Sequence, residues 1–164
     1  MSKERQVALV NPNCGGNYVQ TTYRGREHLG LGYLAAELQR VGVNGKIIDS
    51  RIMAHRPEEA AEQILDIEPS IIAFSLIAKD ATPWTEEVIK LVRQQKPDVH
   101  AVAGNYFPTL QPQRAFESVP DLDSIVIGEG DITFLEMAQI IHQGGDWTKL
   151  KGIAHKDIDG RIVY

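Results

Sequence analysis

The stretch SIIAFSLI (residues 70–77) is a nearly continuous apolar run bounded by Pro69 and Lys79. A strand with one solvated face alternates apolar and polar residues, whereas a strand buried on both faces is apolar almost throughout. Such strands occur in parallel sheets that helices cover on both sides. The run therefore predicts a central strand of an α/β protein.

Short β-rich runs and helical patterns alternate on either side of this stretch. Further strands are expected at residues 6–10, 46–48, 100–103 and 124–127. Helices are expected at residues 29–41, from Pro57 onward, from a cap at Thr82 onward, and at residues 112–117 and 132–141. Five β-then-α units with short connections predict a doubly wound, five-stranded parallel sheet with helices on both faces. The flavodoxin-like order 2-1-3-4-5 suits five strands.

The end of the chain follows a different pattern. Residues 152–155 and 161–164 flank Asp157-Ile158-Asp159-Gly160, and Asp-Gly is a strong hairpin signal. We therefore expect a C-terminal β-hairpin within residues 150–164, attached to the sheet edge or lying against it, after a βα core in residues 1–145. A length of 164 residues fits one domain, so residues 1–164 are expected to form a single unit.

Composition argues against several classes of protein. The net charge is −5, from 17 basic and 22 acidic residues without a basic stripe, so nucleic-acid binding is not expected. There is no run of about 18 apolar residues, and the N-terminal MSKERQ has no apolar signal-peptide core, so a cytoplasmic protein without a membrane span is expected. The single cysteine, Cys14, and five scattered histidines give no zinc-type cluster, so no metal ligand is assigned to protein side chains.

The position of a ligand can be predicted from the fold class. In open α/β sheets, ligands bind beyond the carboxyl ends of the strands, which selects the loops at residues 11–17, 75–80, 104–109 and 128–131. Three of these loops contain glycines after an apolar strand, where a ligand can approach the backbone closely. The P-loop string, the dinucleotide fingerprint and the hydrolase elbow are all absent, and no catalytic dyad emerges.

Five segments carry a resemblance to a known family. They are LGLGYLAAELQRVG (residues 29–42), FSL (74–76), AGNYFPT (103–109), GEGDITFLEM (128–137) and GIAHKDIDGRIVY (152–164). In order and spacing they resemble the cobalamin-binding domains at the N-termini of class B radical-SAM enzymes, and the last segment resembles the hairpin that precedes the radical-SAM barrel. The resemblance implies a domain that binds cobalamin (vitamin B12) with its dimethylbenzimidazole tail detached from cobalt and sunk between strands, and with the corrin over the carboxyl strand ends.

The resemblance also implies which residues contact the cofactor. Ser75 and its two successors would line the tail pocket, Gly104 and Asn105 would pass close to the nucleotide loop, and the 128–130 loop would border the tail or ribose. The full set of cofactor-binding residues implied in this way is Asn13, Cys14, Gly15, Ser75, Leu76, Ile77, Lys79, Gly104, Asn105, Tyr106, Phe107, Gly128, Glu129 and Gly130.

The sequence departs from the family pattern at several positions. Residues 11–17 lack the His of the D-x-H-x-x-G motif, so no His lower ligand to cobalt is expected. Asn105 stands where a second glycine is usual, although Asn tolerates positive φ better than most residues. His28 stands where a proline often precedes the helix.

One cysteine cannot supply the C-x-x-x-C-x-x-C motif of a [4Fe–4S] cluster. S-adenosylmethionine and the cluster would therefore belong to a radical-SAM core in cis or in trans, in a methyltransferase-type enzyme. This chain alone is not expected to be catalytic. A non-enzymatic ligand or light sensor and an interaction module remain as alternatives.

Overall fold

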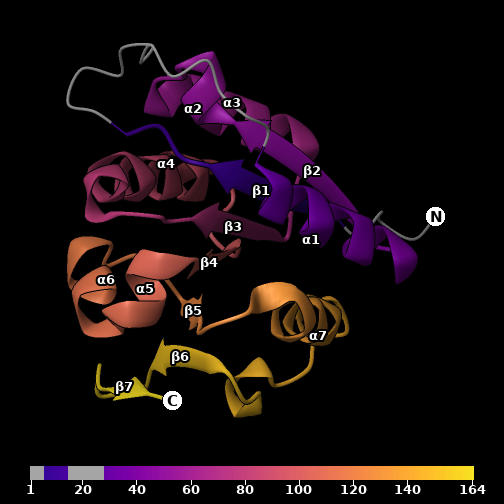
Figure 1. Ribbon diagram of the computed structural model, residues 1–164, viewed down its shortest axis with the longest axis vertical. Coiled ribbons are helices and arrows are strands. Elements are labelled where there is room, and N and C mark those ends of the chain that lie inside the picture. The colour runs from indigo at the N-terminus through magenta and orange to yellow at the C-terminus, as the bar shows by residue number, and fades with distance from the viewer. Residues whose placement is uncertain (1–5, 15–27) are drawn as a thin grey trace.

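The computed structural model describes residues 6–14 and 28–164. The chain is an α/β protein, as the sequence predicts, with one sheet in the order β2-β1-β3-β4-β5-β6-β7 (Figure 1). The parallel strands are β1 (Gln6–Asn11), β2 (Asn44–Asp49), β3 (Ile71–Ser75), β4 (His100–Gly104) and β5 (Ser124–Val126). The strands β6 (Ile153–Lys156) and β7 (Ile162–Val163) continue the sheet in antiparallel orientation.

Within the described residues the sheet therefore has seven strands, two more than the five-stranded parallel sheet that the sequence predicts, and the two are the C-terminal pair. The additional pair arises because β6 pairs with β5, with Ser124 opposite His155, so that the C-terminal segment extends the main sheet. The central strand is also shorter than the expected run 70–77. Its ladder with β4 ends at Ser75 opposite Gly104, and the short helix η1 (Lys79–Ala81) follows.

Helices cover both faces of the sheet, and Figure 1 shows α1 and α7 on one side with α4, α5 and α6 on the other. Strand alternation divides the core accordingly: Leu9 and Ala73 pack toward α1 and α7, whereas Val10 and Phe74 pack toward α3, α4 and α6. The helices are α1 (Leu29–Arg40), α2 (Ser50–Met53), α3 (Pro57–Ile67), α4 (Thr82–Gln95), α5 (Tyr106–Leu110), α6 (Pro112–Ser118), α7 (Gly130–His142) and η2 (Trp147–Lys149).

Three helix starts differ from the sequence prediction, and one of them is that of α7, which begins at Gly130 rather than at residue 132. Thr82 is not the cap of α4 but its first residue, and its hydroxyl donates to the Lys79 carbonyl at 2.8 Å. The short helix α5 was not expected, and it begins where the Asn105 side chain accepts a hydrogen bond from the Tyr106 backbone N–H. Asn105 thus acts as a helix cap directly after β4.

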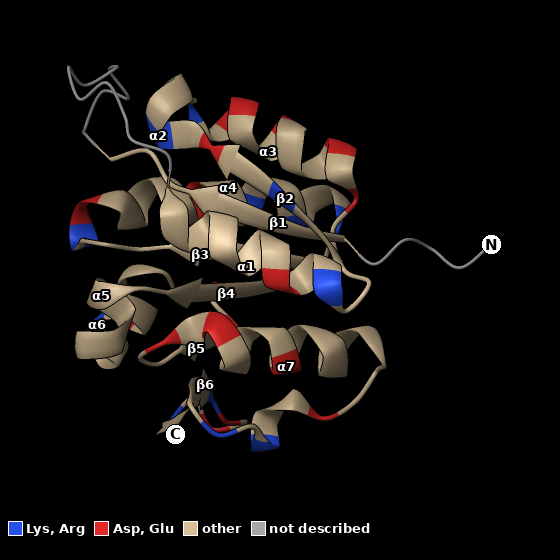
Figure 2. Ribbon diagram, turned by 45° about the vertical axis from the view of Figure 1, so that its right-hand side comes forward, with Lys and Arg blue, Asp and Glu red and all other residues tan. Residues whose placement is uncertain are grey.

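Figure 2 shows Lys and Arg scattered over separate elements rather than gathered into one stripe in that view. None of the helices that the structure describes is long and apolar enough to cross a membrane.

Gly32 lies in the interior of α1, where a Cβ would meet no atom within 4 Å. Because alanine loses less backbone entropy than glycine in a helix, we expect Gly32→Ala to raise the free energy of unfolding by about 1 kcal/mol, measured by urea denaturation. Gly30→Ala is the matched control. Its Cβ would lie 3.3 Å from the His28 ring, so its free energy of unfolding should rise less. Equal gains at both positions would contradict this account.

Candidate functional site

A cavity of about 550 Å³ lies at the carboxyl end of the sheet, between its face and helices α1 and α7. Strands β3, β4 and β5 form its floor, and the loops that follow them form its rim. Its volume falls within the range of about 300–1,000 Å³ that is typical of ligand pockets. The described residues that line it are His28, Gly30, Leu31, Leu34, Ala73, Phe74, Ser75, Val102, Ala103, Gly104, Asn105, Tyr106, Thr109, Val126, Gly128, Glu129, Gly130, Asp131 and Phe134.

The cavity exists because small residues occupy this end of the sheet face. Ala73 pairs with Val102 and Ser75 pairs with Gly104, so these four residues point to the same side of the sheet. At Gly104 a Cβ would approach only the Val126 carbonyl oxygen, at 4.0 Å, which leaves open space above the floor. Large side chains here would fill the space that a ligand needs.

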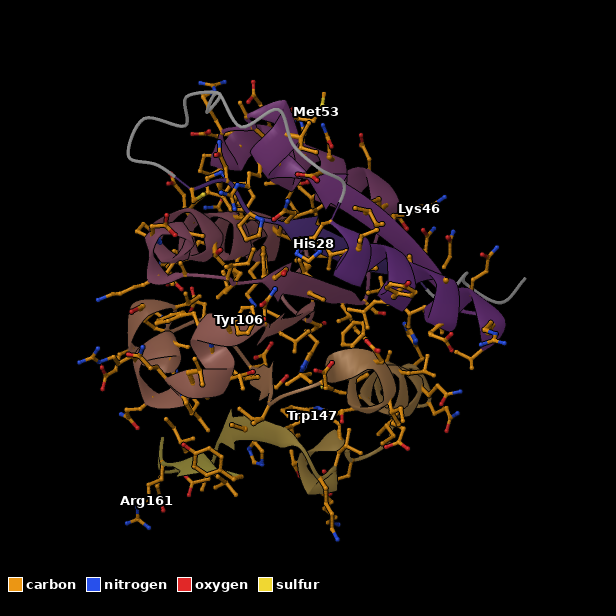
Figure 3. The ribbon with its side chains drawn as sticks, viewed as in Figure 1. His28, Lys46, Met53, Tyr106, Trp147 and Arg161 are labelled. Atoms are coloured by element: carbon orange, nitrogen blue, oxygen red, sulfur yellow. The ribbon has the colours of Figure 1, made fainter. Side chains whose placement is uncertain are left out.

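A polar cluster of three side chains lies on the wall of this cavity. The Ser75 hydroxyl is 2.8 Å from His28 Nε2 and receives a hydrogen bond from Asn105 Nδ2 at 2.9 Å. His28 precedes α1 and also accepts a hydrogen bond at Nδ1 from the Leu31 backbone N–H, which caps the helix. Figure 3 shows His28 and Tyr106 at the starts of α1 and α5. The cluster therefore joins α1, β3 and the β4–α5 turn.

Asn105 has a backbone conformation that favours glycine. Its φ of 83° and ψ of −167° lie in a region that residues with a Cβ rarely adopt, at a cost of about 1–3 kcal/mol. The expectation that asparagine supports a positive-φ turn here is confirmed. Its two side-chain hydrogen bonds, to Ser75 and Tyr106, help to hold this conformation.

A second, smaller cavity of about 120 Å³ adjoins the first, and Ser75 belongs to the lining of both. Cys14 and Ile77 also line it, together with Asn11, Pro12, Arg51, Ala78, Asp80 and Ala81. Burial raises the pKa of the Cys14 thiol, an effect that the Arg51 charge opposes and the Asp80 charge reinforces. The thiol is therefore neutral at pH 7 and a weak metal ligand in this state.

The structure brings most of the sequence-predicted residues to these two cavities. Ser75, Gly104, Asn105, Tyr106, Gly128, Glu129 and Gly130 line the large cavity, and Cys14 and Ile77 line the small one. Four others line neither cavity. Asn13 is buried and donates to the His55 carbonyl, Lys79 is exposed on η1, and Leu76 and Phe107 pack in the core on the opposite face of the sheet. Gly15 lies outside the described residues.

Several lining residues were not among the predicted site residues. His28 is the most informative, because it has a polar contact with Ser75 across 47 positions of sequence. Its position directly before an amphipathic helix gave a weak signal. The apolar lining residues Leu31, Leu34, Val102, Val126 and Phe134 carried no signal that distinguishes them from ordinary core residues.

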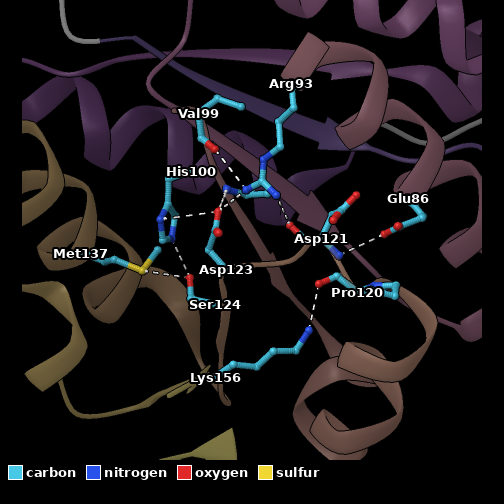
Figure 4. A network of polar contacts seen from close by, with 11 residues as sticks. Glu86, Arg93, Val99, His100, Pro120, Asp121, Asp123, Ser124, Met137 and Lys156 are labelled. Atoms are coloured by element: carbon cyan, nitrogen blue, oxygen red, sulfur yellow. Dashed lines mark hydrogen bonds and ion pairs between the residues drawn. The ribbon is translucent and has the colours of Figure 1, made fainter. Parts of the chain in front are cut away.

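A second polar cluster lies at the amino ends of β4 and β5, away from the cavities (Figure 4). His100 Nε2 is 2.8 Å from the Ser124 hydroxyl, which donates to Met137 Sδ, and His100 Nδ1 is 3.9 Å from Asp123 Oδ2. The residue types match those of a hydrolytic triad. However, Ser124 is 0% exposed and Asp123 is engaged by Arg93 and the Ala101 N–H, so this cluster is structural.

The described residues include no cluster of side chains that could form a metal centre. Within residues 6–14 and 28–164, no group of three His, Cys, Asp or Glu side chains is placed to hold a metal ion. A cavity at the carboxyl edge of a parallel sheet, with glycine-containing loops at its rim, defines the chain as a ligand-binding α/β domain.

The family of this domain is shown by sequence. The model of the B12-binding domain family matches residues 18–138, which is more than half of the chain, and the chain therefore belongs to that family. The expected resemblance to cobalamin-binding domains is confirmed.

Curated relatives and a solved structure are also similar to this chain. A cytidylyl-2-hydroxyethylphosphonate methyltransferase from Streptomyces wedmorensis is 28% identical over 182 aligned residues, which cover 96% of this chain and 32% of that protein. An anaerobic magnesium-protoporphyrin IX monomethyl ester cyclase from Rubrivivax gelatinosus is 26% identical over 137 residues, which cover 81% of this chain and 24% of that protein. The chain thus spans about a third or less of these relatives.

Among solved structures, the cobalamin-dependent S-adenosylmethionine radical enzyme OxsB, with aqua-cobalamin and S-adenosylmethionine bound, superposes with a TM-score of 0.80. The match covers 99% of this chain and 22% of that one, at 22% identity. At this identity the likeness shows a shared fold.

Proposed function

We propose that this chain binds cobalamin with the dimethylbenzimidazole tail detached from cobalt and inserted in the 550 Å³ cavity, and that it serves a radical-SAM enzyme of the methyltransferase type. The observation that supports the proposal is the cavity itself, which lies at the carboxyl edge of the sheet in a chain that belongs to the B12-binding domain family. The corrin would then lie over the carboxyl ends of the strands.

The chemistry of the cavity wall fits the tail of cobalamin. Benzimidazole is a flat, mostly apolar bicycle, and Leu31, Val102 and Phe134 offer it apolar surface. Ser75 supplies a polar group beside them, and the ribose and phosphate of the nucleotide loop would pass the glycine-containing rim. In this role the chain's own residues bind the tail and exclude water from it.

The residues near the expected lower face of the corrin favour a cofactor without a histidine ligand. Both ring nitrogens of His28 are engaged, by Leu31 and Ser75, so neither is free to coordinate cobalt. Asn13 faces the protein interior, and the neighbouring Cys14 thiol is neutral. When bound, the corrin would supply a cobalt that can carry a methyl group.

Several exposed apolar residues lie at or next to the lining of the large cavity. Tyr106 is 70% exposed, and Leu29, Leu110 and Ile132, each adjacent in sequence to a lining residue, are exposed to 72–73%. Exposed apolar side chains beside a cavity are candidates for contact with another group. We propose that corrin and a radical-SAM core, which would hold S-adenosylmethionine and the [4Fe–4S] cluster, cover this rim.

The test is reconstitution with hydroxocobalamin, followed by desalting and an absorption spectrum. We expect about one equivalent of corrinoid to be retained, and much less cobinamide, which has the same corrin but no nucleotide tail. After reduction to the cobalt(II) form, the electron paramagnetic resonance spectrum should lack nitrogen superhyperfine splitting, because no nitrogen would coordinate cobalt from below. Complete loss of cobalamin on desalting, from this chain and from any longer protein that contains it, would refute the proposal.

A further inference from the structure

The His28–Ser75–Asn105 cluster has a fixed direction of hydrogen bonding, because two backbone N–H groups determine it. The Leu31 N–H donates to His28 Nδ1 at 3.2 Å, so Nδ1 carries a lone pair and no proton. A neutral imidazole with an unprotonated Nδ1 has its proton on Nε2. His28 Nε2 therefore donates to the Ser75 hydroxyl oxygen, 2.8 Å away.

The orientation of the Asn105 amide is fixed in the same way. The Tyr106 N–H donates to Asn105 Oδ1 at 2.7 Å, and a flipped amide would set two donors against each other there. The amide nitrogen Nδ2 must then face Ser75, to which it donates at 2.9 Å. The Ser75 oxygen thus accepts hydrogen bonds from two directions.

A hydroxyl oxygen has two lone pairs, and in Ser75 both are occupied by these donors. Its own hydrogen is committed to neither contact. Ser75 is only 8% exposed and lines both cavities, so a ligand in the large cavity meets this hydroxyl as a hydrogen-bond donor that cannot reverse its role. If the ligand offers no acceptor for the hydrogen of this buried hydroxyl, the unpaired donor weakens binding.

We propose that His28 and Asn105 are positioning residues that hold Ser75 as an obligate donor. The cavity is thereby selective for a buried tail with an unprotonated ring nitrogen over a tail of similar size without one. This proposal rests on the proposed function, since it names the part of the ligand that Ser75 recognises.

The test compares two corrinoids in their dicyano forms, in which cyanide occupies both axial positions of cobalt and the tail is free in each. One is cobalamin, and the other is a cobamide whose tail is p-cresol joined through oxygen, which has no ring nitrogen. We expect the unaltered chain to bind cobalamin about tenfold more tightly, the effect of one hydrogen bond. Ser75→Ala should bind the two equally.

The variant His28→Ser separates the two roles of His28, which are to cap α1 and to donate a hydrogen bond to Ser75. Serine is a good helix N-cap, so α1 and the thermal stability should be preserved, but its side chain is too short to reach Ser75. Its preference for cobalamin should fall to about twofold to threefold. A variant that loses stability but keeps the tenfold preference would show that His28 acts only as a cap, and would overturn the proposal.

A readout without corrinoid completes the test. Nitrogen-15 chemical shifts of the ligand-free protein should show His28 protonated at Nε2 and not at Nδ1. The reverse tautomer would overturn the proposal directly. Failure of both corrinoids to bind would overturn the proposed function as well, whereas equal binding of both to the unaltered chain would leave the proposed function standing and overturn only the selectivity.

Discussion

Gly104→Leu is expected to lower the affinity for cobalamin at least about 100-fold while the domain remains folded. Gly104 lies on the cavity floor beside Ser75, and its backbone does not have a positive φ, so a larger residue can adopt its conformation. A Cβ there would meet only one atom, at 4.0 Å. The leucine side chain would therefore occupy the space proposed for the tail without disturbing the core.

The measurement is a cobalamin titration followed by absorbance, together with urea unfolding of the same variant. Gly32→Leu is the matched control, because it makes the same change at a helical position outside the cavity lining, where a Cβ also meets nothing within 4 Å. The control should bind like the unaltered chain. If Gly104→Leu also bound normally, the tail would have to lie elsewhere.

The fold class could be read from the sequence because its signal is local. The apolar run at residues 70–77 and the regular βα alternation indicate buried parallel strands without knowledge of any contact. The junction of β6 with β5 was not decided by sequence. The Asp-Gly signal predicts a hairpin turn, but which edge the hairpin joins depends on contacts between distant residues such as Ser124 and His155.

The site was partly predictable for a related reason. The carboxyl ends of parallel strands meet at one edge, so Ser75, Gly104 and Gly128 could be grouped before the structure was known. However, neighbours in sequence at this edge do not all face the cavity. Successive residues of an extended segment point to opposite faces, which takes Leu76, directly after β3, into the core while Ser75 faces the cavity. Phe107 lies in α5 and packs in the same core cluster as Leu76. The contact of His28 with Ser75 depends on the packing of α1 against the sheet.

A second large effect is expected at the opposite end of the sheet, where stability should fall as the solution is acidified. Burial lowers the pKa of His100 from 6.5 to about 4, although the nearby Asp123 carboxylate opposes this and Arg93 adds to it. Asp123 cannot stabilise a charged His100 fully, because it already accepts hydrogen bonds from Arg93 at 2.6 Å and from the Ala101 N–H at 2.7 Å. The Trp147 ring also packs edge-on against His100, with the two ring centroids 4.6 Å apart.

The direction of this change in stability follows from the pKa of His100 in the unfolded chain, 6.5, and in the folded chain, about 4. Between pH 6.5 and pH 4 the unfolded chain binds a proton at His100 that the folded chain does not, so acidification favours unfolding. The contribution of His100 to the free energy of unfolding is fully present above pH 6.5 and falls by about 2 kcal/mol between pH 7 and pH 5. By pH 4 the loss reaches about 3 kcal/mol. More than half of the effect thus appears before most carboxylates titrate.

His100→Gln tests this expectation, because glutamine keeps a donor for Ser124 but cannot take up a proton. Urea denaturation at pH 8, 7 and 5 gives the free energy of unfolding of both proteins. From pH 8 to pH 7 the two should change in parallel, which serves as the internal control. From pH 7 to pH 5 the unaltered chain should lose about 2 kcal/mol more than the variant. Parallel loss over the whole range would mean that buried His100 does not resist protonation, and that the Ser124–His100–Asp123 cluster is open to solvent in the folded protein.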